Sequence, residues 1–207
     1  AEVKGFDAVA MFGTREARKM DRFTHFATTA AIEALAHSGL KIDDENRDRV
    51  GILIGSGIGG VITIIEQYES LKERGPDRVS PFLIPMMISD SAAGNLAIRF
   101  GARGPNMALA TACASGTNAL GEAAEMIRRG AADAMIAGGA DATVSVLGMA
   151  GFDRLGALSH NNAIPCTSPR PFSKDRDGVV MGEGACVMVL EELEFAKKRG
   201  ANILAEI

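Results

Sequence analysis

Cys113 is the residue whose type and position could do covalent chemistry. It lies in the segment LATACASG at 109 to 116, where an apolar stretch gives way to a helical pattern. At a helix amino terminus, free backbone N–H groups and the helix dipole favour the nucleophilic thiolate. The same N–H groups can stabilise an oxyanion, so the position suits thioester exchange. A free cysteine can also be a small core residue, and its placement alone leaves both interpretations open.

The other two cysteines lack this context. Cys166 follows a proline in a loop and Cys186 lies in an apolar strand pattern, so we interpret both as structural. Three cysteines at wide spacing argue against a disulfide framework and favour a reducing, cytoplasm-like compartment. None of the three histidines pairs with a cysteine at metal-ligand spacing, so no metal site is predicted.

The segment GSGIGG at 55 to 60 fits G-x-G-x-x-G after a predicted strand and before a predicted helix. That context is typical of a dinucleotide-binding turn and would indicate a nicotinamide- or flavin-dependent oxidoreductase. Such a site needs an acidic residue at the end of a second strand about twenty residues further on. The segment there, RGPDRVSP at 74 to 81, is interrupted by proline, and Asp77 follows no apolar strand. The alternative, that the glycines let backbone segments pack closely, is favoured.

Four basic residues near the start, Arg15, Arg18, Lys19 and Arg22, fall at helical spacing and share one face of a predicted helix. A cationic stripe can dock an acidic partner and speed their encounter. An ordinary solvated face is the alternative, and nearby acidic residues make it the simpler interpretation of these residues taken alone.

The elements that must position these residues alternate between helices and short apolar strands. Helices are predicted at 15–36, 61–74, 86–100, 115–129 and 195–199, and strands at 49–55, 106–111, 133–137, 185–191 and 202–207. Buried strands separated by helices imply a mostly parallel or mixed sheet with helices on its faces. The last predicted strand stops at Ile207 and no clear first strand opens the chain, so we expect the protein to continue in both directions.

The composition narrows the class of protein. The 207 residues are 47% hydrophobic and 23% charged, which is ordinary for a globular domain. The net charge of −4 gives no reason to expect nucleic acid as a partner. No apolar stretch is long enough to span a membrane, and the first residues have no signal-peptide pattern. We therefore expect a cytoplasmic protein.

Taken together, the motifs resemble the β-ketoacyl-acyl-carrier-protein synthases of type II, condensing enzymes of the thiolase superfamily. The likeness covers essentially the whole chain. Its most specific parts are FGARGPNMALATACASG at 100 to 116 and RPFSKDRDGVVMGEGACVMVLEELEFAKKRGA at 170 to 201. It implies an α/β, thiolase-like layered fold, with helices packed on a mixed five-stranded sheet. It also implies that residues 1–207 are the amino-terminal half, truncated at both ends, with the carboxy-terminal half absent.

The resemblance also assigns roles by position. Cys113 matches the nucleophile that takes an acyl chain from acyl carrier protein, and its N–H would be one of two oxyanion donors. Ile58 matches the residue that gates the acyl pocket. Leu83, Gly148 and Phe152 match other pocket-lining positions, and Leu83 is expected to reach across a homodimer interface. The docking patch for acyl carrier protein would comprise Arg15, Arg18 and Lys19, although Asp77 stands where the family often has a basic residue.

The implied activity is a decarboxylative Claisen condensation in fatty acid biosynthesis. Malonyl-acyl-carrier protein loses carbon dioxide, and its carbanion attacks an acyl chain held as a thioester on Cys113. No metal or organic cofactor is needed. The two histidines and the lysine that assist decarboxylation belong to the carboxy-terminal half, so the 207 residues alone are expected to be inactive. The alternatives are a thiolase-fold acyltransferase or partner subunit without condensing activity and, more remotely, a dinucleotide-binding oxidoreductase.

Overall fold

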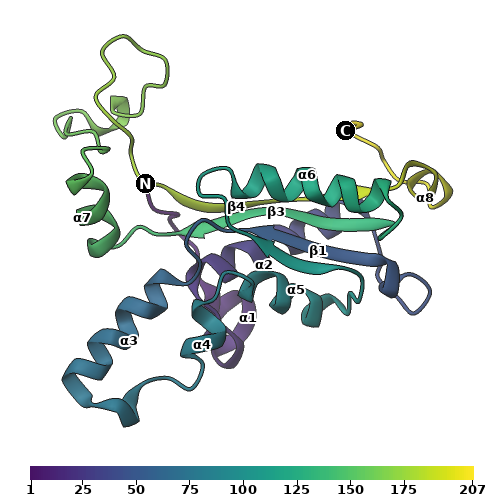
Figure 1. The fold of residues 1–207 in the computed structure, drawn as a ribbon, viewed down its shortest axis with the longest axis horizontal. Coiled ribbons are helices and arrows are strands. Elements are labelled where there is room, and N and C mark those ends of the chain that lie inside the picture. Colours follow the sequence, from purple (N-terminus) through teal and green to yellow (C-terminus); the bar gives the residue numbers. More distant parts are fainter.

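A computed structural model describes all 207 residues. The strands β1 (Val50–Gly55), β2 (Asn106–Leu109), β3 (Ala134–Ala142) and β4 (Glu183–Glu191) form one sheet in the order β2-β1-β3-β4 (Figure 1). Strand β1 is parallel to β2 and β3, whereas β4 is antiparallel to β3. The prediction of a mixed sheet with covering helices is therefore confirmed.

Helices cover both faces of this sheet. Helices α2 (Arg22–Ser38) and α5 (Ser91–Phe100) pack on one face, and α6 (Ser115–Arg128) packs on the other (Figure 1). The remaining helices are α1 (Ala8–Ala17), α3 (Val61–Arg74), α4 (Leu83–Met87), α7 (Val146–Arg154) and α8 (Leu193–Lys198). None of the helices is both long and apolar enough to cross a membrane.

The buried core explains why β1 is apolar along its whole length. Ile52 and Ile54 belong to a cluster with residues of α2 and α5, whereas Leu53 belongs to a second cluster with residues of α6. Because successive side chains of a strand point to opposite faces, a strand covered on both sides must be apolar throughout. All six residues of β1 are buried.

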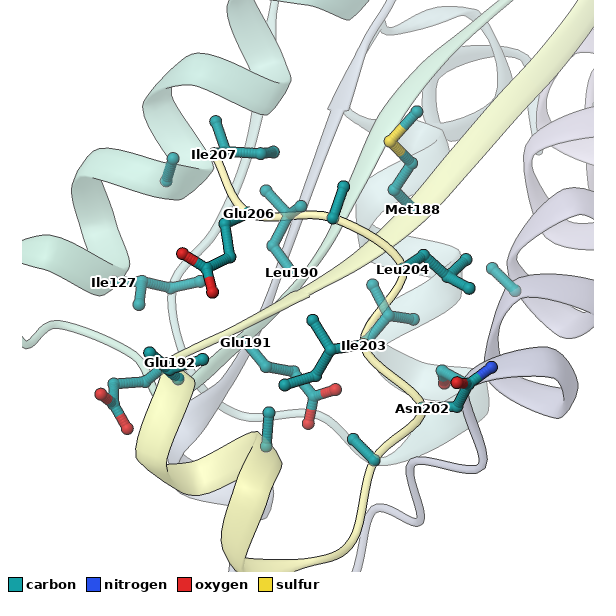
Figure 2. A pocket seen from close by; sticks show the side chains of 18 of the residues that line it. Ile127, Met188, Leu190, Glu191, Glu192, Asn202, Ile203, Leu204, Glu206 and Ile207 are labelled. Atoms are coloured by element: carbon teal, nitrogen blue, oxygen red, sulfur yellow. The ribbon is translucent and has the colours of Figure 1, made fainter.

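The prediction of a fifth strand at 202–207 is wrong, and the sheet has four strands. This segment runs as irregular chain across β4 (Figure 2). Its backbone forms no ladder with any neighbour, and a strand requires such a ladder. Instead, Ile203, Leu204 and Ile207 help to enclose a cavity of about 580 Å³ with Met188 and Leu190 of β4.

The single helix predicted at 15–36 is divided into α1 and α2. The division is caused by Asp21, whose buried carboxylate caps α2 by accepting the N–H of Phe23 at 3.2 Å. The same carboxylate accepts both the N–H and the hydroxyl of Thr63 in α3, at 2.8 and 2.7 Å. A contact over 42 positions in sequence therefore decides where the helix begins.

A second predicted helix, at 86–100, is divided into α4 and α5 by the segment Ile88–Asp90. Helix α4 also begins earlier than predicted, and Pro85 lies in its first turn, where a proline is tolerated. The other predicted strands correspond to β1 through β4, with β3 extending to Ala142. Helix α7 was not predicted.

Candidate active site

The candidate site lies at one edge of the sheet. Strands β1, β2 and β3 are parallel, so their carboxyl ends meet at that edge, and the chain leaves them towards α3, α6 and α7 (Figure 1). In open α/β sheets, ligands bind at this carboxyl edge. The predicted nucleophile is positioned by the connection from β2 to α6.

The turn before α6 has a fixed conformation. The hydroxyl of Ser115 accepts the N–H of Thr111 at 2.9 Å and donates to the carbonyl oxygen of Ala112 at 2.6 Å. Ser115 itself is buried. Ala112 adopts a φ of 53°, a left-handed conformation that costs energy for a residue with a side chain. The turn is therefore held in a strained shape that places the next residue, Cys113, at the surface.

Cys113 is exposed and lines a cavity of about 450 Å³. The backbone N–H groups of Cys113, Gly116 and Thr117 donate to no protein acceptor. These N–H groups lie at the amino end of α6, a helix of 14 residues. The positive end of the helix dipole is at the same place. The site thus combines an accessible thiol with free N–H donors beside it, the arrangement that acyl transfer requires.

Three chemically active residues in this cavity were not predicted as site residues: Asp141, Glu183 and Cys186. Cys186 was interpreted as structural, but it is exposed. It pairs with Gly139 across β3 and β4. Since Gly139 lies against α6, the side chain opposite it faces the same side of the sheet as the candidate nucleophile. The side of the sheet that Cys186 faces can be predicted from strand alternation only when the pairing of β3 with β4 is known.

Glu183 has a different role at the cavity wall. Its side chain is almost fully buried and forms a bidentate ion pair with Arg22, at 2.6 and 2.9 Å. The hydrogen bond and charge of Arg22 hold the pKa of Glu183 below its usual range, against the opposing effect of burial. The pair joins α2 to the start of β4 and keeps Glu183 charged, which suits a structural link better than proton transfer.

Glycines allow α6 to approach the sheet closely. A Cβ atom at Gly55 would overlap the carbonyl group of Ser115, and one at Gly139 would lie 2.8 Å from the Cα of Gly116. At Gly60 it would overlap the carbonyl oxygen of Met86. The predicted close packing is therefore confirmed. No second strand follows α3 at 74–81, as a dinucleotide-binding unit would require.

The turn at 56–59, which follows β1, is bound by Asp141 at the end of β3. Its carboxylate accepts hydrogen bonds from the hydroxyl of Ser56 and the N–H groups of Gly57 and Ile58. The partners are separated by 83 to 85 positions in sequence. Sequence reasoning missed Asp141 because its partners are distant in sequence and two of the three are backbone groups, which leave no pattern in side chains.

None of the four predicted pocket residues lines the cavity. Ile58 is 48% exposed on the turn after β1, and Leu83 is half-buried at the start of α4. Gly148 and Phe152 lie on α7, where Ser145 caps the helix by accepting the N–H of Gly148 at 3.1 Å. They thus lie on three separate elements, and the structure does not bring them together in this cavity.

The predicted basic stripe does not form on one helix. Arg15 lies in the last turn of α1, Arg18 caps that helix, and Lys19 lies in the connection, paired with Glu16 at 2.9 Å. Arg22 forms an ion pair with Glu183 and is therefore not part of the surface set of basic residues. Arg15 and Arg18 are exposed and Lys19 is half-buried, so three of the four cations remain on the surface.

The histidines lie outside the cavity. His25 is mostly buried, stacks on Phe12 at 5.8 Å and has its Nε2 2.9 Å from the carbonyl oxygen of Ala17. Burial lowers its pKa. His160 lies 3.5 Å from Asp153 at the surface, and His37 is exposed at the end of α2. No group of three or more His, Cys, Asp and Glu residues is placed to hold a metal ion.

The chain is similar to known proteins over its whole length. Residues 2–196 match the family model described as the N-terminal domain of β-ketoacyl synthase. The 3-oxoacyl-[acyl-carrier-protein] synthase 2 of Vibrio cholerae is 51% identical over 205 residues, 99% of this chain and 50% of that protein. The protein of the same name from Synechocystis is 49% identical over 206 residues, 100% of this chain and 50% of the relative. The chain thus spans about half the length of these relatives.

Solved structures agree with this likeness. A β-ketoacyl synthase from Burkholderia phymatum has a TM-score of 0.85 at 37% identity, covering 98% of this chain and 50% of the other. The ishigamide ketosynthase/chain length factor has a TM-score of 0.88 at 33% identity, covering 100% of this chain and 50% of the other. The structure of a type II PKS acyl-carrier protein in complex with its ketosynthase has a TM-score of 0.79 at 26% identity. The match covers 97% of this chain and 55% of the other.

Proposed function

This chain belongs to the β-ketoacyl synthase family, and from that membership we propose that it is the amino-terminal half of a 3-oxoacyl-acyl-carrier-protein synthase of fatty acid biosynthesis. One observation carries the proposal: Cys113 is exposed at the amino end of α6, beside free N–H groups, in a cavity. The carboxy-terminal half would complete the enzyme.

The first step is acyl transfer to Cys113. Its thiolate attacks the carbonyl carbon of an acyl thioester on acyl carrier protein, and a new C–S bond forms. The N–H of Cys113 and a second donor stabilise the oxyanion of the tetrahedral intermediate. The carrier's thiolate then leaves and takes up a proton. The free N–H of Cys113 supports this role, since it has no competing protein acceptor.

The second step is condensation. Malonyl-acyl-carrier protein loses carbon dioxide, and the resulting carbanion attacks the carbonyl carbon of the thioester on Cys113. The C–S bond to Cys113 breaks, and a 3-ketoacyl chain longer by two carbons leaves on the carrier. Two histidines and a lysine of the carboxy-terminal half would assist decarboxylation. His25, His37 and His160 do not replace them, because none lines the cavity.

A direct test uses the full-length protein with acyl- and malonyl-acyl-carrier protein. Release of carbon dioxide together with a 3-ketoacyl product would support the proposal. Formation of an acyl-enzyme without condensation would instead favour a thiolase-fold acyltransferase or partner subunit. That second function has one favourable observation, the likeness to a ketosynthase/chain length factor structure. Absence of any acyl-enzyme would contradict both.

Ile58 is proposed to gate the acyl pocket, which Leu83, Gly148 and Phe152 would line. Ile58→Phe in the full-length enzyme is expected to lower kcat/KM for the longest accepted acyl chain by about tenfold or more. The phenyl ring is larger than the isoleucine side chain and would shorten the pocket. Chain-length profiles of kcat/KM measure this. The matched control is Ile64→Phe, the same change at another exposed isoleucine, on α3. A profile that Ile58→Phe leaves unchanged would count against the gating role.

Arg15, Arg18 and Lys19 are proposed to dock the acidic acyl carrier protein. Reversing Arg18 and Lys19 to Glu is expected to raise KM for the carrier-bound substrate by about tenfold, because repulsion replaces attraction during encounter. Alkylation of Cys113 by iodoacetamide should keep its rate. The control is the same reversal at Lys197 and Lys198 on α8, which lie outside the proposed patch. Equal loss of carrier use and alkylation would indicate a folding defect instead.

The remaining assignments complete the proposal. We place the enzyme in the cytoplasm as a homodimer, with Leu83 reaching across the interface. Exposed apolar side chains near Leu83 support this, since Phe82 and Ile84 are 41% and 58% exposed. Bond formation needs no cofactor, because the thiol and the decarboxylating substrate supply the nucleophiles.

A further inference from the structure

The turn at 56–59 is held by one carboxylate. Asp141 Oδ1 accepts the hydroxyl of Ser56 at 2.9 Å and the N–H of Ile58 at 3.3 Å, and Oδ2 accepts the N–H of Gly57 at 3.0 Å. Hydrogen bonds to an ionised carboxylate are stronger than those between neutral groups. Asp141 therefore binds three successive residues of the turn through a single rigid side chain at the end of β3.

The contacts continue through Ser56 to the rest of the turn. Ser56 is completely buried, and its hydroxyl accepts the N–H of Gly59 at 2.9 Å while it donates to Asp141. Beyond the turn, the N–H of Gly60 donates to the carbonyl oxygen of Met87 at 3.0 Å. The turn is thus fixed at both ends, while the side chain of Ile58 is left 48% exposed.

The turn at 56–59 also lies close to the backbone that carries Cys113. Asp141 and Cys113 line one cavity. Gly57 fits between them, because a Cβ atom there would lie 3.3 Å from the carbonyl oxygen of Ala112 and 3.5 Å from Oδ2 of Asp141. The turn that carries Ile58 therefore lies beside both Asp141 and the backbone before Cys113.

We propose that Asp141 is a positioning residue that fixes Ile58 relative to Cys113 and thereby sets which acyl chain lengths the enzyme accepts. The inference rests on the proposed function, in which Ile58 limits the acyl pocket. Asp141 acts through the backbone of the turn, and it takes no part in bond making. Its loss would let the turn shift, and small displacements of positioning groups have large kinetic effects.

The experiment compares Asp141→Asn with Asp133→Asn in the full-length enzyme. Asp133 lies just before the other end of β3 and pairs with Arg49 at 2.6 and 3.1 Å, so its variant also loses a charged contact of the same strand, but away from the cavity. Asp141→Asn is expected to change the ratio of kcat/KM between the longest and the shortest accepted chain by at least about tenfold. Asp133→Asn should leave that ratio unchanged.

Hydrogen exchange supplies a readout that does not depend on activity. The amides of Gly57 and Ile58 should exchange faster in Asp141→Asn than in the wild type, and not in Asp133→Asn. If Asp141→Asn does not fold, Ser56→Ala tests the same set of hydrogen bonds. It removes the hydroxyl that joins Asp141 to the N–H of Gly59 and keeps the carboxylate. It should move the chain-length ratio in the same direction.

Two failures can be told apart. If the wild-type enzyme forms no 3-ketoacyl product, the proposed function fails. If it does, and Ile58→Phe changes the chain-length profile while Asp141→Asn or Ser56→Ala leaves both the profile and the exchange rates unchanged, the role of Asp141 is overturned.

Discussion

Full-length protein carrying Cys113→Ala is expected to form no acyl-enzyme and to lose condensation by at least about a thousandfold. Alanine has no nucleophilic atom, and the other residues of the cavity cannot replace it in the same place. The acyl-enzyme is detected by intact-protein mass spectrometry after incubation with acyl-acyl-carrier protein. Condensation is followed by the 3-ketoacyl product.

The matched control for this variant is Cys186→Ala. Cys186 lines the same cavity, so its removal changes the local volume and thiol content in a similar way. It should still give the acyl-enzyme. An acyl adduct on Cys113→Ala that disappears in the double variant would assign the nucleophile to Cys186 and contradict the proposal.

Gly55→Ala is expected to destabilise the protein by about 2–3 kcal/mol. The added methyl group would overlap the carbonyl group of Ser115, which is backbone and cannot turn away as a flexible side chain could. Helix α6 would have to move off the sheet, and Cys113 with it. We therefore expect slower alkylation of Cys113 together with a lower midpoint in urea unfolding.

Gly94→Ala is the control, because it makes the same change where no atom lies within 4 Å of the new methyl group. Gly94 is in α5, where alanine should stabilise the helix by about 0.5–1 kcal/mol. The two substitutions should thus change stability in opposite directions. Equal stability of the two variants would show that α6 does not depend on a close approach at Gly55.

Local patterns predicted the elements whose causes are local. Strand β1, helix α3 and helix α6 follow from apolar runs, glycine stops and helical spacing near their own residues. The helix predicted at 15–36 failed because Asp21 caps α2 at Phe23 and also binds Thr63, and only the first of these contacts is local. The strand predicted at 202–207 failed because its apolar residues line a cavity beside β4 while its backbone forms no ladder.

The candidate site was predicted in the same uneven way. Cys113 could be chosen as a candidate because a strand, a turn and a helix start lie within a few residues of it. Asp141 and Cys186 could not, since each reaches the cavity through pairing between distant strands. The residues alone made Cys113 a candidate and left a core role open, and the family resemblance favoured the nucleophile. The hydrogen bonds that hold its turn became visible only in the folded chain.

The exposure of all three cysteines has a practical consequence for anyone titrating active sites. A thiol reagent can label up to three thiols within residues 1–207, so labelling stoichiometry overstates the amount of accessible Cys113. An electrophilic inhibitor aimed at this cavity meets two thiols there, Cys113 and Cys186. Modification by such a compound does not by itself identify which thiol has reacted, so peptide mapping of the adduct is required before the reactive group is optimised.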